Sequence, residues 1–185
     1  GAFESCTALT SITIPKSVVL ASEYLFFRCS NLTTVTFEEP TSLTTISIAM
    51  FYKCTMLTTI TIPPNVTTIG RAAFSGCTVL TSITIPAEVN NIGETAFQST
   101  GLTSITIPSG VTSLGNYAFN LAGSLQTVTF EGTSEINTIG QGVFKNDASL
   151  NSINIPASVI TISGEAFYGC TALTSITIPE NVTSI

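Results

Sequence analysis

Five cysteines occupy one position of a repeating pattern, and they are the first residues with a conceivable chemical role: Cys6, Cys29, Cys54, Cys77 and Cys170. Strands stacked about 4.8 Å apart would bring cysteines of adjacent repeats within disulfide distance. However, their number is odd, no Cys-x-x-Cys spacing occurs, and each lies between a recurrent Phe and a recurrent Leu. We therefore interpret the thiols as buried core residues rather than disulfides or metal ligands.

Hydroxyl groups are the second candidate, because Thr and Ser supply 53 of the 185 residues. Pairs of hydroxyls at alternate positions recur in successive repeats and are predicted to form two columns on one exposed face. The candidate binding residues are Ser11, Thr13, Thr34, Thr36, Thr59, Thr61, Ser82, Thr84, Ser104, Thr106, Thr127, Thr129, Ser175 and Thr177. Such columns would either stabilise a solvated sheet through cross-strand hydroxyl pairs or bind a polar polymer, a glycan or an extended protein segment.

Catalytic and metal-binding patterns are missing. The chain has no His, which excludes Ser-His-Asp and Cys-His pairs and His-ligated zinc. One adjacent acidic pair occurs, Glu38-Glu39, with Glu131 and Glu135 as its counterpart four repeats later. We interpret these carboxylates as solvated turn charges rather than a glycosidase pair or a cation site. The sequence predicts no enzymatic activity, no metal and no cofactor.

Charge and hydropathy exclude further classes. The net charge is −6, and only 9% of residues are charged. With five cations in total, the chain lacks the basic surface that nucleic acids or anionic membranes require. A hydrophobic content of 44% argues against disorder. No apolar run is long enough to span a bilayer, so we expect no membrane insertion of this segment.

These residues are positioned by a repeat of about 23 residues, which is the length of a leucine-rich repeat. One Phe recurs as Phe3, Phe26, Phe51, Phe74, Phe97, Phe119, Phe144 and Phe167. One Leu follows as Leu9, Leu32, Leu57, Leu80, Leu102, Leu125, Leu150 and Leu173. We number the coils one to eight by these Phe residues. Residues 1–185 are predicted to form a single solenoid of about eight repeats of 22–25 residues.

Each repeat is predicted to contain two extended segments and one short turn. Residues 80–85 form the first strand of the fourth repeat by β-branched content and alternation, and Pro86 ends it. A second extended piece follows, as in residues 66–69 of the third repeat. The next residues, Ala73-Phe74, are predicted to form a short helical or 3₁₀ turn. We expect a positive φ at the glycines that follow the second segment, Gly70, Gly93, Gly115 and Gly140.

A single repeat buries too few apolar side chains to offset the entropy of ordering its backbone, so stability must accumulate between stacked coils. The chain begins and ends inside a repeat without a recognisable cap. We therefore expect a segment of a longer array, or a chain that associates end to end.

The pattern Phe-x-x-Cys-x-x-Leu-Thr-x-Ile-x-Ile-Pro, with Ala before the Phe as in Ala73-Phe74, closely resembles the BspA-like class of leucine-rich repeats over essentially the whole chain. The resemblance implies a curved, right-handed leucine-rich solenoid, mainly β, with short parallel strands and the Thr/Ser strand on its inner face. It also implies a surface or secreted protein, of bacteria or of some parasitic protists, that takes part in adhesion to host matrix or to other cells.

The resulting hypothesis is a non-enzymatic extracellular or cell-surface recognition or adhesion module. Its partner would be a protein or glycan on a host or neighbouring cell, bound multivalently because the columns lack Tyr, Trp and Arg. The principal alternative is a structural protein that assembles end to end or into a coat. Ice binding by the Thr columns is a remote third. Three Asn-x-Thr sequons, at Asn31, Asn65 and Asn181, leave glycosylation open.

Overall fold

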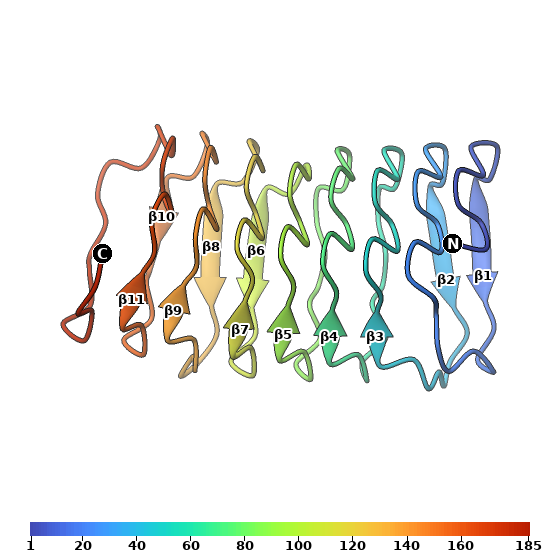
Figure 1. Ribbon diagram of the computed structural model, residues 1–185, viewed down its shortest axis with the longest axis horizontal. Coiled ribbons are helices and arrows are strands. Elements are labelled where there is room, and N and C mark those ends of the chain that lie inside the picture. Colours follow the sequence, from blue (N-terminus) through green and yellow to red (C-terminus); the bar gives the residue numbers. More distant parts are fainter.

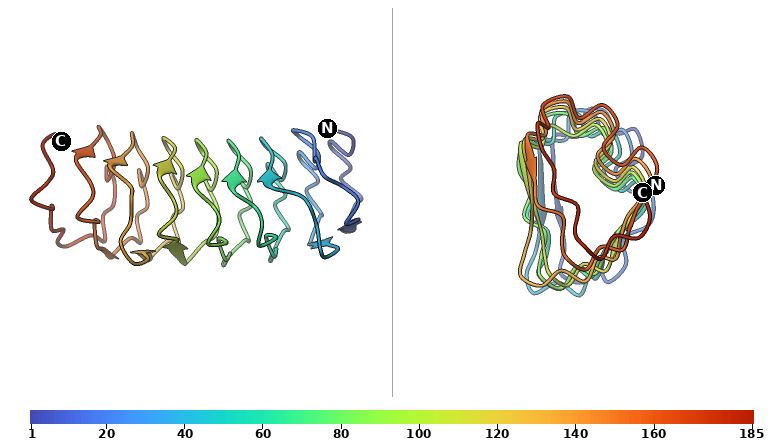
Figure 2. Two further views of the ribbon diagram at one scale, coloured as in Figure 1. Left: turned by 90° about the horizontal axis from the view of Figure 1, so that it is seen from below. Right: turned by 90° about the vertical axis from the view of Figure 1, so that its left-hand side faces the viewer.

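The computed structural model describes residues 1–185 and shows a solenoid whose coils stack along one axis (Figure 1). Seen along that axis, the coils lie nearly on top of one another (Figure 2, right). All strand pairs are parallel and join one coil to a neighbouring coil in register. None of the segments forms a helix of the length and apolarity that crossing a bilayer requires.

One wall of the solenoid carries the Thr/Ser strands, and we call it the strand face: residues 11–14, 34–37, 59–62, 82–85, 104–107, 127–130, 152–155 and 175–178. Its strands are β1 (Ser11–Ile14), β2 (Thr34–Phe37), β6 (Ser104–Ile107), β8 (Thr127–Phe130) and β10 (Ser152–Ile153). β1 pairs with β2, and β6, β8 and β10 form a three-stranded sheet. Inward Ile, Val and Phe alternate with outward Ser and Thr, as period-two patterning requires.

The prediction of a paired strand in every coil is wrong for coils three, four and eight, where residues 59–62, 82–85 and 175–178 form no ladder. In coils three and four the in-and-out pattern persists, since Ile62 and Ile85 are buried while Thr61 and Thr84 are exposed. Two length irregularities bracket these two coils: the two residues inserted after β2 and the residue missing between Phe97 and Leu102. Loop length alone does not decide the pairing, since β8 and β10 pair across the equivalent two-residue insertion of coil six.

A second wall follows and carries the more continuous pairing. Its strands are β3 (Thr45–Ile46), β4 (Thr68–Ile69), β5 (Asn91–Ile92), β7 (Ser113–Leu114), β9 (Thr138–Ile139) and β11 (Thr161–Ile162). β3, β4, β5 and β7 form one sheet, and β9 pairs with β11. A bridge between Thr161 and Ser184 extends the pairing to coil eight. The second extended segment expected from the sequence is thus confirmed.

The predicted short helical turn at Ala-Phe is absent, and a turn with left-handed residues takes its place. In coil three φ is 49° at Ala49 and 54° at Lys53. This geometry points every second N–H at the next coil: those of Ala49, Phe51 and Lys53 donate to carbonyls of coil four at 2.8, 2.9 and 2.7 Å. A helical turn would direct all its amides along its own axis. Hydrogen bonds between coils therefore hold non-glycine residues in a disfavoured conformation.

The expectation of positive φ at Gly70, Gly93, Gly115 and Gly140 is wrong, because none of them is left-handed. The first three are needed for a different reason, the close approach of one coil to the next. A Cβ built on Gly93 would lie 2.6 Å from the backbone nitrogen of Arg71, and one on Gly70 would lie 2.9 Å from backbone atoms of the preceding coil. At these positions the second wall of one coil packs directly on the backbone of the coil before it.

The core is a single cluster of 45 buried hydrophobic residues that runs the length of the solenoid. Its central feature is the file of recurrent Phe side chains. The seven successive pairs, from Phe3 to Phe167, have ring centroids 5.4–5.7 Å apart and interplanar angles of 5–18°. Each such aromatic pair adds about 0.5–1.5 kcal/mol beyond the area it buries. The stacking of like residue on like residue is therefore confirmed.

Replacement of Gly93 by Ala tests the close approach at the second wall. Gly-to-Ala changes ordinarily stabilise by lowering the entropy of the unfolded chain, provided that the new methyl group fits. At Gly93 it does not fit, and we expect a loss of about 1–3 kcal/mol in urea unfolding monitored by circular dichroism. Gly164 is the matched control, since a Cβ there meets no atom within 4 Å. Equal stabilities of the two variants would contradict the packing described.

Candidate functional site

The strand face places the predicted binding residues at the surface in two files. Thirteen of the fourteen candidates are exposed, and Thr127 is half-buried. Where the ladder is intact, like positions lie side by side: Thr13 beside Thr36, and Thr106 beside Thr129. The columns arise because alternate residues of each strand face outward and each coil repeats the same pattern.

The hydroxyls in these two columns have almost no hydrogen-bond partners within the protein. Thr34 has a 3.5 Å contact with the hydroxyl of Thr33, and the other thirteen candidates make no side-chain hydrogen bond within the protein. No hydroxyl pair links adjacent coils along either column. The interpretation of the columns as cross-strand hydroxyl pairs that stabilise the sheet therefore finds no support, and these donors and acceptors are free to meet solvent or a ligand.

Some hydroxyls elsewhere in the molecule link one coil to the next. Thr33 donates to the carbonyl of Thr10 at 2.9 Å, beside the two columns. On the second wall, the hydroxyl of Thr67 donates to the carbonyl of Thr44 at 3.3 Å, and Thr112 makes the equivalent bond at 3.2 Å. Some Ser and Thr hydroxyls thus bridge neighbouring coils, whereas those of the two strand-face columns do not.

The strand face is not one uninterrupted lattice. Between coils three and four the unpaired segments line a shallow cleft of about 250 Å³, which includes Thr61 and Thr84. A similar cleft of about 260 Å³ between coils four and five includes Ser82 and Thr106. The hydroxyl columns are in ladder register at β1–β2 and at β6–β8, whereas no ladder joins the strand-face segments between them. This geometry weakens the ice-binding alternative, since an ordered water layer needs an unbroken array.

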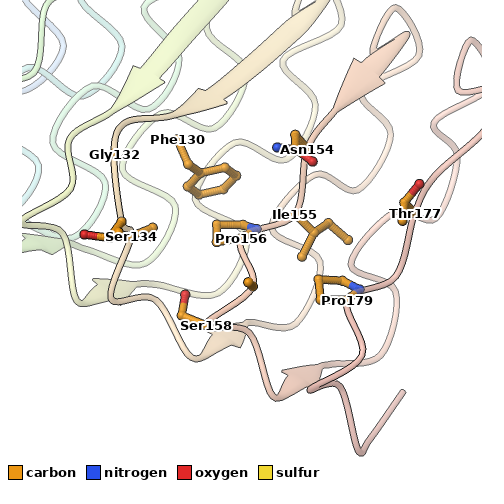
Figure 3. Close-up of a pocket in the computed structure, with 11 residues that line it drawn as sticks. Phe130, Gly132, Ser134, Asn154, Ile155, Pro156, Ser158, Thr177 and Pro179 are labelled. Atoms are coloured by element: carbon orange, nitrogen blue, oxygen red, sulfur yellow. The ribbon is translucent and has the colours of Figure 1, made fainter.

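The largest cavity lies at the edge of the strand face, where the inserted turn of coil six meets coils seven and eight (Figure 3). Its volume is about 680 Å³, and its lining includes Phe130, Asn154, Pro156 and Pro179. Of the predicted binding residues, only Thr177 lines it. Sequence reasoning missed this site, although three signals mark it: Phe for the usual Ile at position 130, Asn for Thr at 154, and the two inserted residues.

A second cluster that sequence reasoning missed lies on the turn segment of coils two and three. The rings of Phe27 and Tyr52 stack with centroids 4.7 Å apart and planes 9° apart. Arg28 lies over the Phe27 ring at 5.2 Å, and Lys53 over the Tyr52 ring at 5.5 Å. The paired aromatic residues in Phe26-Phe27 and Phe51-Tyr52 were the available signal. The cluster contains no predicted binding residue.

The acidic residues of the inserted turn in coil two are engaged with backbone groups. The Glu38 carboxylate accepts a hydrogen bond from the backbone N–H of Lys16 at 3.4 Å, and that of Glu39 accepts one from the N–H of Thr41 at 3.1 Å. The one ion pair, between Lys145 and Glu165, spans 2.9 Å at the surface. No group of three or more Cys, Asp or Glu side chains is placed to hold a metal ion.

The repeat described above matches a known protein family. A model of the BspA type leucine rich repeat region matches residues 1–100 and 90–185, with six copies of the repeat. The chain belongs to the BspA-type leucine-rich repeat family. A search of curated proteins found no match.

Solved leucine-rich repeat structures support the assignment. A leucine-rich repeat protein from Bacteroides ovatus is 30% identical, with a TM-score of 0.84 over 94% of this chain and 46% of its own. A leucine rich cell surface protein from Faecalibacterium prausnitzii is 32% identical, with a TM-score of 0.62 over all of this chain and 57% of its own. The pneumococcal vaccine antigen PcpA is 22% identical, with a TM-score of 0.70 over 94% of this chain and 51% of its own. At this level of identity the similarity supports the fold only. The chain thus spans about half the length of these proteins.

The cysteines of the BspA-type repeat help to bind one coil to the next. The Cys54 thiol donates to the carbonyl of Phe26 at 3.2 Å, and the Cys77 thiol to that of Phe51 at 3.1 Å. All five cysteines are free. Burial raises the pKa of Cys54 to about 12 and that of Cys77 well above its usual value, so neither is a nucleophile. The prediction of buried core thiols is confirmed for these and for Cys29, whereas Cys170 is half-buried and Cys6 is exposed.

Asp147 occupies the cysteine position of coil seven and is fully buried. Its Oδ1 accepts a hydrogen bond from the backbone N–H of Ala122 at 2.9 Å, while Oδ2 has no partner. Burial raises the pKa of this carboxyl to about 8, and the Ala122 hydrogen bond opposes the shift only in part. Near neutral pH the folded protein therefore keeps Asp147 largely protonated, in the place where other coils hold a thiol.

The three sequon asparagines also link BspA-type coils. The side-chain nitrogens of Asn31, Asn65 and Asn181 donate to backbone carbonyls of the preceding coil at 2.8, 3.0 and 2.7 Å. The nitrogen that N-glycosylation would modify is in each case already a structural donor. These contacts account for asparagine at the three positions without a glycan.

Replacement of Asp147 by Asn tests the buried carboxyl. The unfolded chain releases the Asp147 proton near pH 3.8, whereas the folded chain keeps it until about pH 8. The parent protein therefore loses stability as pH rises through this window. The amide in the variant does not titrate, so we expect Asp147→Asn to gain about 1.4 kcal/mol relative to the parent for each pH unit between about 4 and 8, and no more above it. Urea unfolding across this range measures the difference.

Glu88→Gln, at an exposed position, is the matched control and is expected to show no such trend. A stability difference between Asp147→Asn and the parent that stays constant across the acidic and neutral range would show that Asp147 ionises normally in the folded chain.

Proposed function

We propose that this chain is a non-catalytic recognition and adhesion module of a cell-surface protein, and that its strand face contacts a protein or glycan on another surface. The observation that carries the proposal is the pair of exposed columns that repeat along the coils and whose hydroxyls form no bond between coils, whereas some other hydroxyls bridge coils. The similarity to a leucine rich cell surface protein supports the location. The leucine-rich solenoid is a typical non-enzymatic repeat scaffold, in line with a sequence that lacks His.

The physics of this face favours many weak contacts over one strong one. A neutral hydrogen bond adds about 0.5–1.5 kcal/mol net, so no single Ser or Thr anchors a partner. Affinity then comes from repetition along the coils and from display of many copies on one surface. The columns themselves carry no charged side chain, so the interaction is expected to depend little on ionic strength.

The double variant Thr61→Lys with Thr84→Lys tests the strand face. Two long cations in adjacent coils disrupt a neutral hydrogen-bonding surface without touching the core, since both residues are exposed. Beads coated with the parent chain should be retained on epithelial cell monolayers or on a glycan array. We expect the variant to be retained about ten-fold less, because multivalency multiplies each lost contact.

Ser113→Lys with Thr138→Lys is the matched control, with the same charge change at exposed positions in adjacent coils of the second wall. Equal retention of parent and strand-face variant would overturn the proposal, as would no retention of the parent on either surface. If the strand-face changes were silent while charged substitutions in an end coil abolished oligomers in sedimentation, the assembly hypothesis would be favoured instead.

A further inference from the structure

The cavity at the edge of the strand face is built by an irregularity of the repeat. In coil six the chain continues from Phe130 through an inserted turn in which Gly132 has a φ of 52°. Figure 3 shows the Phe130 ring lying between this turn and the side chains of Asn154 and Pro156. The volume of about 680 Å³ is in the range of small-molecule sites. Coil eight closes the far side with Thr177 and Pro179.

The lining combines apolar surface with a few free polar groups. Phe130, Pro156 and Pro179 supply the apolar part, while Asn154 and Thr177 have side chains with no hydrogen bond inside the protein. No charged residue lines the cavity.

Two other hydroxyls of the lining are already engaged. Ser158 donates to the carbonyl of Ile136 at 2.7 Å, and Ser134 accepts from the N–H of the same residue at 3.3 Å. These bonds fix the wall of the cavity on the side of the inserted turn. The polar side chains left for a ligand are those of Asn154 and Thr177, on the side of the strand face, and that of Thr133 in the inserted turn.

The cavity continues onto the strand face. A neighbouring groove of about 310 Å³ runs between β8 and coil seven and is lined by Thr127, Thr129 and Ser152. Phe130 and Asn154 line both spaces and mark their junction. A ligand unit in the cavity would therefore have its next unit among the free hydroxyls of the strand face, which suits a chain molecule rather than an isolated one.

We propose that this cavity binds a neutral pyranose residue of a glycan whose neighbouring residues lie along the strand face. The inference rests on the proposed function and names its ligand class. A pyranose presents an apolar C–H surface, which packs against the Phe130 ring and the prolines, and a rim of hydroxyls. The Asn154 amide supplies both a donor and an acceptor to such hydroxyls. The uncharged lining gives a carboxylate, sulfate or phosphate no partner.

Coil two offers an internal comparison. Residues 34–38 and 127–131 share the sequence Thr-Val-Thr-Phe-Glu, and both are followed by a two-residue insertion. In coil two, however, Phe37 is buried, and Glu39 and Pro40 stand where coil six has Gly132 and Thr133. Glu39 and the rigid ring of Pro40 thus stand where coil six has two small uncharged residues, while Glu131 and Glu135 flank these residues outside the cavity lining. Of the two coils, coil six has the lining that a neutral sugar requires.

Two variants test the site by restoring the residue that is usual at each position. Phe130→Ile installs the Ile found at this position in most other coils, and Asn154→Thr installs the usual Thr. The probes are methyl β-D-glucopyranoside, methyl α-D-mannopyranoside and methyl β-D-galactopyranoside, added at millimolar concentrations to isotope-labelled protein. We expect at least one glycoside to shift the NMR signals of the Asn154 side chain and Gly132, and binding to weaken about five-fold or more in each variant.

Several results would overturn the inference. These are no shift with any of the three glycosides, shifts confined to residues away from the cavity, or unchanged binding by both variants. Tighter binding of methyl β-D-glucuronide would refute a neutral ligand. Shifts caused by the blocked peptide acetyl-Ala-Gly-Ser-amide, with none from the glycosides, would identify a peptide site instead.

The bead assay separates this inference from the proposed function. If retention depends on Thr61 and Thr84 while no glycoside enters the cavity, only the inference about the pyranose site fails. Glycoside binding that is lost in Phe130→Ile but retained in the Thr61→Lys with Thr84→Lys variant supports the inference by itself.

Discussion

The stacking of each coil on the next in register is the constraint on which everything else depends. One coil cannot bury enough apolar surface to remain folded, so its Phe, Leu and Ile must meet the same residues of its neighbours. The Phe file, with ring centroids 5.4–5.7 Å apart, shows how closely the register is kept. Glycines at the second wall also support the stacking, because they let the backbones of adjacent coils approach closely. Left-handed residues in the turns support it by pointing backbone N–H groups at the next coil.

The stacking of coils also decides which polar side chains form hydrogen bonds within the protein. Where a side chain sits above a carbonyl of the preceding coil, it donates to it, whether it is the thiol of Cys77, the amide of Asn65 or the hydroxyl of Thr67. These neutral bonds explain how a chain with 9% charged residues remains ordered with a single ion pair. The strand-face hydroxyls are among those that make no such bond, because strand geometry turns them outward, away from any carbonyl. Their freedom follows from position rather than residue type.

Departures from the regular repeat give this chain local sites that a stack of identical coils would not contain. Perfect repeats give uniform walls, whereas the inserted turn of coil six lines a cavity of about 680 Å³. Asp147 is another departure, a carboxyl in a file of thiols, and burial raises its pKa to about 8. In a BspA-type array, distinct chemistry is therefore to be sought where the repeat is broken.

The repeat could be predicted from sequence alone, because stacking in register requires the same residue types to return every 22–25 positions. The same periodicity predicts which residues form the core, which Ser and Thr face outward and which thiols are buried. What only the tertiary structure decided depends on how adjacent backbones meet. The sequence could not show that Gly93 serves close packing rather than positive φ, since both needs select glycine. Nor could it show which hydroxyls are free, or that Phe130 and Asn154, from different coils, share one cavity. Hydrogen bonds and cavities depend on small offsets between neighbouring backbones that no spacing of residues encodes.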